Sequence, residues 1–308
     1  MWARNIRRAA LATALALAAC GIAGASASPA AADWPSCLGE PATIVGTEGN
    51  DTIAGTSRDD VIVGLGGDDV ITSGGSSELD LICGGDGNDS VIVTTGGDGF
   101  FPFNAAAVSG DAGDDRIQGS RDTFVVADYE SSPQPVTVDL GAGTESGWGN
   151  DTLVRVTAVE GSPHDDVLSG SDASDGLYGE AGDDTIAGLG GGDYLSGGSG
   201  TNSIDGGAGR DWLDDWDAPT GVHVNLAKGT AAGWGEDTLR SIEQVYGSKH
   251  ADTLVGGAGA DRLDGLGGND RLYGQAGKDH LDGGKGRDRA DGGPARDVCH
   301  AERTVRCP

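Results

Sequence analysis

Large side chains are scarce in this chain. Of its 308 residues, 15 are Phe, Trp or Tyr and one is Met, whereas 57 are Gly. Basic residues are also few: 20 Lys and Arg stand against 49 Asp and Glu, and the formal net charge is −29. Such a chain cannot build an ordinary thick core, and its like charges repel one another. The sign of the charge also argues against nucleic acid as a partner.

Long apolar runs and catalytic motifs are missing as well. No stretch after the N-terminal segment is long and apolar enough to span a bilayer, so we expect no membrane insertion. His-Glu-x-x-His, Gly-x-Ser-x-Gly and the phosphate-binding loop do not occur. Structural or solvent roles are expected for the histidines, which lack metal-ligand spacing: His164, His223, His250, His280 and His300. We therefore expect that the protein is not an enzyme.

Residues 1–32 are typical of an export signal followed by a short linker. Arg4, Arg7 and Arg8 precede the apolar run 9–19, and small residues allow cleavage after Ala27 or Ala32. Residues 17–20 (Leu-Ala-Ala-Cys) also resemble a bacterial lipoprotein box, in which Cys20 would be lipidated. We expect a secreted, extracellular protein, with lipid anchoring through Cys20 at the cell surface as the alternative.

The cysteines fit an oxidising compartment. Besides Cys20, the chain has Cys37, Cys83, Cys299 and Cys307, and four cysteines allow three pairings. The sequence alone does not choose among these pairings. We favour Cys37 with Cys83 and Cys299 with Cys307, because each pair would hold one end of the repeat array together.

The chain is rich in one nine-residue phrase, G-x-x-G-x-D-x-(Leu/Ile)-x. Residues 265–273 read Gly-Leu-Gly-Gly-Asn-Asp-Arg-Leu-Tyr, and residues 274–282 repeat the pattern. Positions are counted from the first glycine, so Gly265 is at position one and Asp270 at position six. A fixed period of this kind is the signature of a solenoid, in which each repeat stacks on its neighbours.

The repeats form three blocks between an N-terminal cap (33–45) and a disulfide-capped C-terminal end (301–308). The first block (46–118) is irregular and interrupted at 93–109, where Phe100, Phe101 and Phe103 lie; the others span 161–214 and 247–300. We predict that the residues at position six are metal ligands: Asp51, Asp60, Asp69, Asp80, Asp89, Asp115, Asp166, Asp175, Asp184, Asp193, Asn202, Asp211, Asp252, Asp261, Asp270, Asp279, Asp288 and Asp297.

A duplicated spacer with longer coils separates the blocks, at 119–160 and 215–246. Residues 136–140 (Val-Thr-Val-Asp-Leu) lead to Gly-Trp-Gly at 147–149, and residues 222–226 lead in the same way to 233–235. Alternating apolar residues such as Val136, Val138 and Leu140 predict a half-buried strand. We expect each spacer to be part of the same solenoid.

The phrase has the chemistry of a calcium-binding turn. Glycine at position one, often at position two, and at position four permits positive φ and a tight turn, which the carboxylate at position six closes. Ligation by carboxylates and backbone carbonyls suits a hard cation, and its loose geometry suits Ca²⁺ better than Mg²⁺. The residue at position eight is aliphatic, as in Ile71, Leu168 and Leu254, and should be buried from a strand of about three residues.

The free energies require a metal. Burying one Leu or Ile contributes about 1.5–3 kcal/mol, whereas ordering each of the nine Gly-rich residues costs about 1–2 kcal/mol. The apolar contribution is too small. Ca²⁺ must therefore supply folding free energy as a cofactor of several ions, and the metal-free chain should be largely disordered.

The phrase resembles the glycine-rich repeat of the RTX (haemolysin-type) calcium-binding family, G-G-x-G-x-D-x-U-x, over nearly all of the chain after Ala42. The resemblance implies an all-β fold, a right-handed parallel β-roll with two nonapeptides per coil, two parallel sheets and Ca²⁺ in the turns of both edges. It also implies ions shared by residues two repeats apart, such as Asp51 with Asp69, Asp175 with Asp193, Asp252 with Asp270, and Asp270 with Asp288. The chain looks like the small secreted actinobacterial-type proteins made only of such repeats.

A few residues depart from the family pattern. Arg58 and His164 replace the glycine at position four, and Asn202 replaces the aspartate, which should weaken its sites. Ala290 and Cys299 replace the aliphatic residue at position eight, so the core should thin toward the C-terminus.

These patterns predict an extracellular calcium-binding β-roll that folds after export and acts as a structural or interaction module. A cell-surface or extracellular polymer is its candidate contact, and its affinity for Ca²⁺ should be roughly 10⁻⁴–10⁻³ M. The alternative is a secreted polysaccharide-active enzyme that uses the roll as a scaffold for a site on the spacers. The third reading, a membrane-lytic toxin, is weakened by the lack of an insertion segment.

Overall fold

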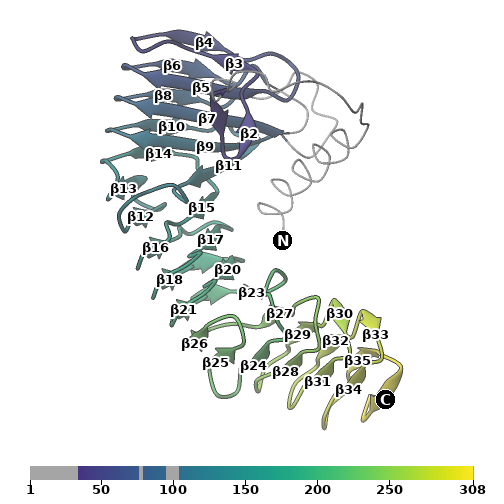
Figure 1. The fold of residues 1–308 in the computed structure, drawn as a ribbon. Helices are drawn as coiled ribbons and strands as arrows, with labels where there is room; N and C mark the ends of the chain where they lie inside the picture. The colour runs from purple at the N-terminus through teal and green to yellow at the C-terminus, as the bar shows by residue number, and fades with distance from the viewer. Residues whose placement is uncertain (1–33, 76–78, 95–103, 308) are drawn as a thin grey trace, which may run out of the picture. The chain divides into compact units, whose positions relative to one another are not determined.

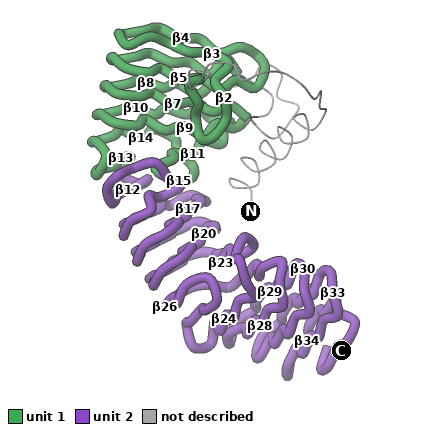
Figure 2. Tube along the Cα trace, in the orientation of Figure 1, with its two compact units in different colours: residues 1–129, 143–158 green, residues 130–142, 159–308 purple. Residues whose placement is uncertain are grey.

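The computed structural model describes residues 34–75, 79–94 and 104–307, and every regular element within them is a β-strand. The expected export signal, Cys20, residues 76–78 and the three phenylalanines of the first block lie outside the described residues. In the described part of the chain, no helix is long and apolar enough to cross a membrane. The chain divides into two compact units, residues 1–129 with 143–158 and residues 130–142 with 159–308 (Figure 2).

The first unit consists of two ladders of short parallel strands, which Figure 1 shows stacked coil upon coil. One ladder contains, in spatial order, β4 (Thr52–Ala54), β6 (Val70–Thr72), β8 (Ser90–Ile92), β10 (Arg116–Gln118) and β14 (Thr152–Val154), with β13 (Thr144–Ser146) antiparallel to β14. The other contains β3 (Ile44–Val45), β5 (Val61–Gly66), β7 (Leu79–Asp86), β9 (Asn104–Ala112) and β11 (Thr123–Asp128).

The register of these ladders follows the repeat. Ile53 pairs with Ile71 and Ile71 with Val91, so each residue at position eight stacks on the equivalent residue one coil away. Two nonapeptides therefore make one coil, and the two ladders receive alternate repeats. This arrangement confirms the all-β parallel roll expected from the sequence.

The N-terminal end of the first unit is closed by a hairpin. Strands β1 (Ser36–Cys37) and β2 (Glu40–Pro41) pair in antiparallel fashion, and the Trp34 indole Nε1–H donates a hydrogen bond to the carbonyl of Ala42. Cys37 is joined to Cys83 of β7 by a disulfide, which is the pairing that we favoured. The hairpin is thus covalently attached to the repeat array.

The second unit continues the same plan. One ladder contains β17 (Gly176–Tyr178), β20 (Tyr194–Ser196), β23 (Trp212–Asp214), β27 (Gln244–Tyr246), β29 (Arg262–Asp264), β32 (His280–Asp282) and β35 (Val298–His300). The other contains β12 (Thr137–Asp139), β16 (Val167–Ser169), β18 (Thr185–Ala187), β21 (Ser203–Asp205), β26 (Glu236–Arg240), β25 (Thr230–Ala232), β24 (His223–Asn225), β28 (Thr253–Val255), β31 (Arg271–Tyr273), β34 (Arg289–Asp291) and β36 (Arg303–Val305).

Two further strand pairs and one single strand remain. Turn strands β19 (Gly190–Gly191) and β22 (Ala208–Gly209) pair in parallel, as do β30 (Gly267–Gly268) and β33 (Lys285–Gly286). Strand β15 spans Ala158–Glu160.

The second spacer forms a three-stranded meander within its ladder. Strand β26 runs parallel to β21, β25 runs antiparallel to both β26 and β24, and β24 runs parallel to β28. Its inward residues Val224, Ala231 and Leu239 are buried. The spacer therefore adds an antiparallel insertion to the roll, a form that the expectation of longer coils did not specify.

The core is one aliphatic side chain thick. Position-eight residues such as Ile62, Leu168 and Leu272 are fully buried, while the residues beside them on the same strands face outward in most coils. The core becomes thinner in the last coils, where fully buried Ala290 and half-buried Cys299 take this position. Such a core buries little apolar surface for each residue that must be ordered.

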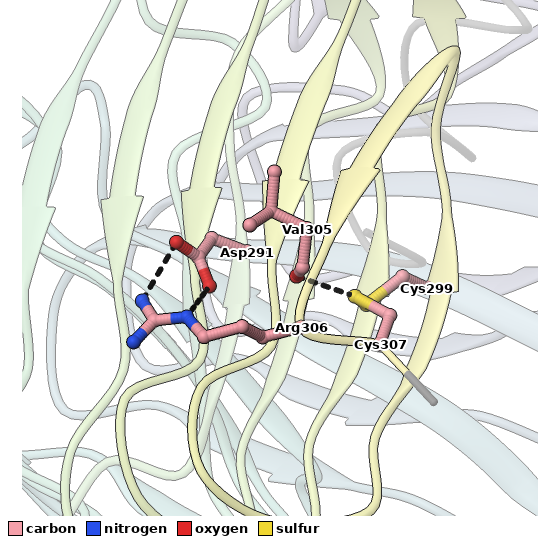
Figure 3. Close-up of polar contacts among 5 residues, drawn as sticks. All are labelled: Asp291, Cys299, Val305, Arg306 and Cys307. Carbon is pink, nitrogen blue, oxygen red and sulfur yellow. Dashed lines mark hydrogen bonds and ion pairs between the residues drawn. A yellow bond between two sulfur atoms is a disulfide. The ribbon is translucent and has the colours of Figure 1, made fainter.

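The C-terminal end is fastened by two contacts, which Figure 3 shows together. Cys299 of β35 forms a disulfide with Cys307, the second pairing that we favoured. The Arg306 guanidinium donates two hydrogen bonds of 2.7 Å to the carboxylate of Asp291, and this lowers the pKa of Asp291. Strand β36 is thereby held against β34.

Candidate metal centres

The predicted ligands at position six lie directly before the strands, at the turns on the edges of the two ladders, except Asp80, which is the second residue of β7. In twelve of the eighteen, the side-chain oxygen Oδ1 accepts a hydrogen bond from the backbone N–H of the position-six residue one coil earlier. In Asp166 and Asp252 the donor is the backbone N–H of Val136 or Val222. Asp252 N–H donates to Asp270 at 2.8 Å, for example, and Asp175 N–H donates to Asp193 at 2.9 Å. The four pairs that the resemblance implied as sharing ions, including Asp51 with Asp69 and Asp270 with Asp288, are all joined in this way.

These hydrogen bonds link the acids of the described residues into six runs, each defined by a chain of N–H to carboxylate bonds. The runs are Asp51–Asp69–Asp89–Asp115–Asp151, Asp60–Asp80, Asp166–Asp184–Asn202–Asp237, Asp175–Asp193–Asp211–Glu243, Asp252–Asp270–Asp288–Glu302 and Asp261–Asp279–Asp297.

The first acid of every run lies in what we call a closed turn, in which Oδ2 accepts a hydrogen bond from the backbone N–H of position two. The donors are Thr47, Thr56, Ser162, Ser171, Ser248 and Gly257, which bond to Asp51, Asp60, Asp166, Asp175, Asp252 and Asp261 at 2.5–2.7 Å. The Ser and Thr donors add a bond from the side-chain hydroxyl. The protein therefore bonds Oδ2 in all six of these carboxylates, and in Asp166 and Asp252 it bonds Oδ1 as well.

The later aspartates lie in what we call open turns. There the backbone of position two is left-handed, as at Leu65 (φ 83°), Glu180 (φ 73°) and Leu266 (φ 59°), so its N–H does not reach the carboxylate. Among the described residues, Oδ2 is buried without a hydrogen-bond partner in ten such aspartates: Asp69, Asp89, Asp115, Asp184, Asp193, Asp211, Asp270, Asp279, Asp288 and Asp297. A buried carboxylate oxygen without a partner is costly and points to a ligand.

Glycine at position one is required by space in the open turns. A Cβ on Gly179 would collide with Asp184 Oδ2 and lie 2.9 Å from the carbonyl oxygen of Gly197 in the next coil. A Cβ on Gly265 would lie 2.5 Å from Asp270 Oδ2 and 3.0 Å from the carbonyl oxygen of Gly283. Position one therefore lacks a side chain because a carboxylate and a carbonyl converge there. Positive φ, which we expected at positions one, two and four, occurs at positions two and four, as at Gly182 (φ 131°), and not at position one of the open turns.

Burial acts strongly on these acids. Burial, together with the charges of neighbouring aspartates, raises the pKa of Asp184, Asp193 and Asp270 to about 7 and that of Asp115 to about 8. At neutral pH, ionised rows of this kind oppose the stacking of the coils unless positive charge lies between them.

The donor set fits Ca²⁺. It consists of carboxylate and carbonyl oxygens alone, and in eight of the ten open turns a partnerless Oδ2 and a carbonyl oxygen of the next coil converge on the glycine at position one. Oxygen-only ligation from carboxylates and carbonyls is the preference of hard divalent cations. The closed turns fit less well, because their carboxylates are already bonded. This group includes Asp261, whose Oδ2 accepts a bond from Gly257 N–H at 2.6 Å.

Four acids complete the runs and were missed in the sequence. Asp151 and Asp237 end two runs from within the spacers. There Gly-Trp-Gly-(Asn/Glu)-Asp-Thr-Leu corresponds to positions two to eight of a nonapeptide that lacks only the glycine of position one. Glu243 and Glu302 end two others from coils that contain no glycine at positions one, two or four. The spacer motif could have been recognised, but the two glutamates carry no repeat signal.

Each spacer also adds one buried acid beside its run. In the first spacer Glu145 is 3% exposed, its Oε2 has no hydrogen-bond partner, and burial with the charge of Asp151 raises its pKa to about 7. In the second, the equivalent residue is Ala231, and buried Asp215 lies close enough to Asp237 for the charge of Asp237 to raise its pKa. The two copies thus supply the extra carboxylate from different positions.

One edge of the first unit lacks acids in its later coils. Ala106 pairs with Asp80 and Val125 pairs with Ala106, so the positions that follow Asp80 are apolar. Val125 N–H donates to the Thr157 hydroxyl at 3.0 Å, which replaces the carboxylate bond of the other coils. A hydroxyl and two aliphatic groups offer a cation no charge, so the runs of this edge are interrupted here.

The chain was compared with known proteins. A model of the RTX calcium-binding nonapeptide repeat (4 copies) matches residues 45–77, 108–123, 160–195, 188–214, 246–281 and 273–303. No curated protein gave a significant match. The matched ranges cover more than half of the chain and contain all six closed turns and nine of the ten open turns, all but that of Asp89. The chain therefore belongs to the family of RTX calcium-binding nonapeptide-repeat proteins.

Proposed function

We propose that this protein is an extracellular β-roll that folds when Ca²⁺ binds after export and then acts as a structural or interaction module. The ten partnerless Oδ2 atoms of the open turns carry the proposal. These atoms recur at position six of the repeat and lie near backbone carbonyls of the next coil. The chain that carries them belongs to a family whose repeats bind calcium.

The same geometry separates sixteen of the eighteen predicted ligands into two groups, ten in open turns and six in closed turns. The other two are Asn202 and Asp80, which accepts a hydrogen bond from Asp60 N–H. The open-turn aspartates hold the ions through Oδ2 and accept a hydrogen bond from the preceding coil through Oδ1. The closed-turn aspartates begin each run and act mainly as turn formers, because Ser, Thr or Gly at position two already binds them. Asn202 supplies an amide oxygen to Asp184 N–H and donates from Nδ2 to Asp237, so it links coils without adding charge.

Export supports a calcium-dependent fold. The expected signal in residues 1–32 and the two disulfides both suit the cell exterior, where Ca²⁺ is plentiful. Before export, the low Ca²⁺ concentration of the cytosol would leave the acidic chain unfolded, which suits passage through a narrow translocation channel. The alternative outcome of the same export is a protein that stays anchored by lipid at the cell surface through Cys20.

A structural role is favoured over catalysis by the form of the spacers. The enzyme alternative needed the spacers as the site, but the second spacer is a meander whose inward residues extend the core. Its buried acid Asp215 lies beside a carboxylate run, where a cation is the expected neighbour.

The test is a titration of the purified protein with Ca²⁺ after exhaustive chelation, followed by far-ultraviolet circular dichroism and by sedimentation. We expect a cooperative gain of β signal and a more compact particle as Ca²⁺ approaches about 10⁻⁴–10⁻³ M, and no such gain with Mg²⁺ at the same concentration. A chelated protein that is already compact, with its full β signal, would refute the proposal.

A further inference from the structure

Two of the five histidines lie together on neighbouring strands of the second unit. His280 begins β32 and His300 ends β35, the neighbouring strand of the same ladder. Their rings are 5.4 Å apart between centroids and meet edge to face. Asp282 of β32 is the register partner of His300, and one of its oxygens lies 3.9 Å from His300 Nδ1.

The three side chains form a compact donor set. One ligand atom from each of His280, Asp282 and His300 can be chosen so that all three lie within 4.8 Å of one another, which occurs at no other group of His, Cys, Asp and Glu in residues 34–75, 79–94 and 104–307. The sequence did not suggest this group, because 20 residues separate the two histidines. The register of two strands brings them together.

Two imidazoles and one carboxylate are not the ligands that Ca²⁺ prefers. Imidazole suits zinc and the other borderline first-row metals, and sites with three protein ligands leave a fourth position for water. Bond lengths of about 2.0–2.1 Å in a tetrahedral site place ligand atoms about 3.3 Å apart, so the donors must approach by at most about 1.5 Å. The side chain of His300 is 61% exposed and can rotate to make this approach.

The surroundings favour a bound cation. Asp264 is the register partner of Asp282 in the preceding coil, and His280 lies close enough to affect its titration. The backbone of β35 is fixed by its pairing with β32 and by the disulfide of Cys299, the residue directly before His300. The donors therefore stand on rigid strands in an acidic field, which limits the entropy lost on binding.

We propose that His280, Asp282 and His300 bind one Zn²⁺ ion or a similar borderline divalent cation, separately from the carboxylate runs. The competing account of the same geometry is an ion pair between a protonated His300 and Asp282 with His280 packed against it. The two accounts differ in whether both imidazoles are needed for metal binding.

Calorimetric titration of Zn²⁺ into the Ca²⁺-saturated protein tests the proposal. Saturating Ca²⁺ occupies the oxygen sites, so the heat reports the remaining donors. We expect one Zn²⁺ per chain, and in His280→Ala and His300→Ala an affinity at least about tenfold weaker, because even indirect partners of a metal change affinity by 10–100-fold. His223→Ala, an exposed strand histidine of the meander, is the matched control and should bind as the parent does.

Co²⁺ provides a second readout, since its visible absorption reports four-coordinate nitrogen and oxygen ligation. Circular dichroism in Ca²⁺ confirms that each variant retains the roll. Absence of stoichiometric Zn²⁺ binding, or binding that is equally strong in His280→Ala and His300→Ala, would overturn the proposal. Neither result would bear on the proposed calcium-dependent folding, because that folding is measured without Zn²⁺.

Discussion

The difference between open and closed turns predicts opposite behaviour for two adjacent aspartates of one run. Asp252 and Asp270 both accept a backbone N–H through Oδ1, from Val222 at 2.7 Å and from Asp252 at 2.8 Å. They differ at Oδ2, which in Asp252 accepts a bond of 2.7 Å from Ser248 N–H and in Asp270 has no partner in the protein. The substitutions Asp252→Asn and Asp270→Asn therefore change one oxygen in two different surroundings.

In Asp270→Asn the amide oxygen can keep the bond to Asp252 N–H, while an NH₂ group replaces the oxygen that faces the cation. Asn202 shows that an asparagine is accommodated at this position of the roll. At a Ca²⁺ concentration 100 times the Kd, one site stabilises the fold by about 2.7 kcal/mol. Asp270 should serve two sites, so the variant should lose about 5 kcal/mol in Ca²⁺ and little in chelator.

In Asp252→Asn either orientation of the amide sets an NH₂ group against a backbone N–H, that of Ser248 or that of Val222. A buried donor without an acceptor costs about 1–3 kcal/mol, and this loss does not depend on Ca²⁺. Urea unfolding of both variants is measured in excess Ca²⁺ and at low Ca²⁺, and the midpoint of the Ca²⁺ titration is measured for each variant. Together these measurements separate the two effects. Equal shifts of the Ca²⁺ midpoint in the two variants would refute the assignment of open and closed turns.

Three more predictions follow from the same turns and ends. Burial raises the pKa of Asp184 and Asp270 to about 7 and of Asp115 to about 8, above about 3.9 in the unfolded chain, so in chelator the penalty is absent below pH about 4 and grows up to pH about 8. Residual structure in chelator, followed by circular dichroism, should thus increase as the pH falls, while in Ca²⁺ acid should destabilise the roll because protons compete with the metal; the same pH trend in both conditions would contradict this. Gly179→Ala should abolish ion binding in its coil, because the new Cβ collides with Asp184, whereas Gly259→Ala, with nothing within 4 Å, should change stability by less than about 0.5 kcal/mol in thermal unfolding. Removal of the Cys37–Cys83 disulfide (separation 46) should cost about 4 kcal/mol and that of Cys299–Cys307 (separation 8) about 2.5 kcal/mol in denaturant titrations, and the reverse order would count against the loop-entropy account.

Local sequence predicted the repeating unit well. Position eight is buried in nearly every coil, as at Ile71 and Leu254, because an aliphatic residue between outward-facing neighbours has only one way to face on a strand of three residues. Position six lies in the turns at the ladder edges, as the spacing of glycine and aspartate indicated. The expected disulfides are present, since each joins strands or turns at one end of the array.

The sequence predicted less about the spacers and the glycines. The alternating residues around Val224 indicated a strand, but its position in an antiparallel meander depends on pairing with β25 and β28. Glycine at position one was explained by backbone freedom, whereas in the structure it is needed because a carboxylate and a carbonyl of the next coil converge there. That carbonyl lies on a residue 18 positions away, beyond the reach of any local rule.

What the sequence by itself determined is the composition of each coil: one buried aliphatic side chain, one acid in the turn, and little apolar surface. What only the tertiary structure decided is which oxygens remain available, because Oδ1 is bonded by the neighbouring coil and Oδ2 is bonded or left free according to the backbone at position two. The contact between the rings of His280 and His300 has the same origin. Side chains of different repeats meet only when the coils stack, and stacking depends on hydrogen bonds between residues that are distant in the chain.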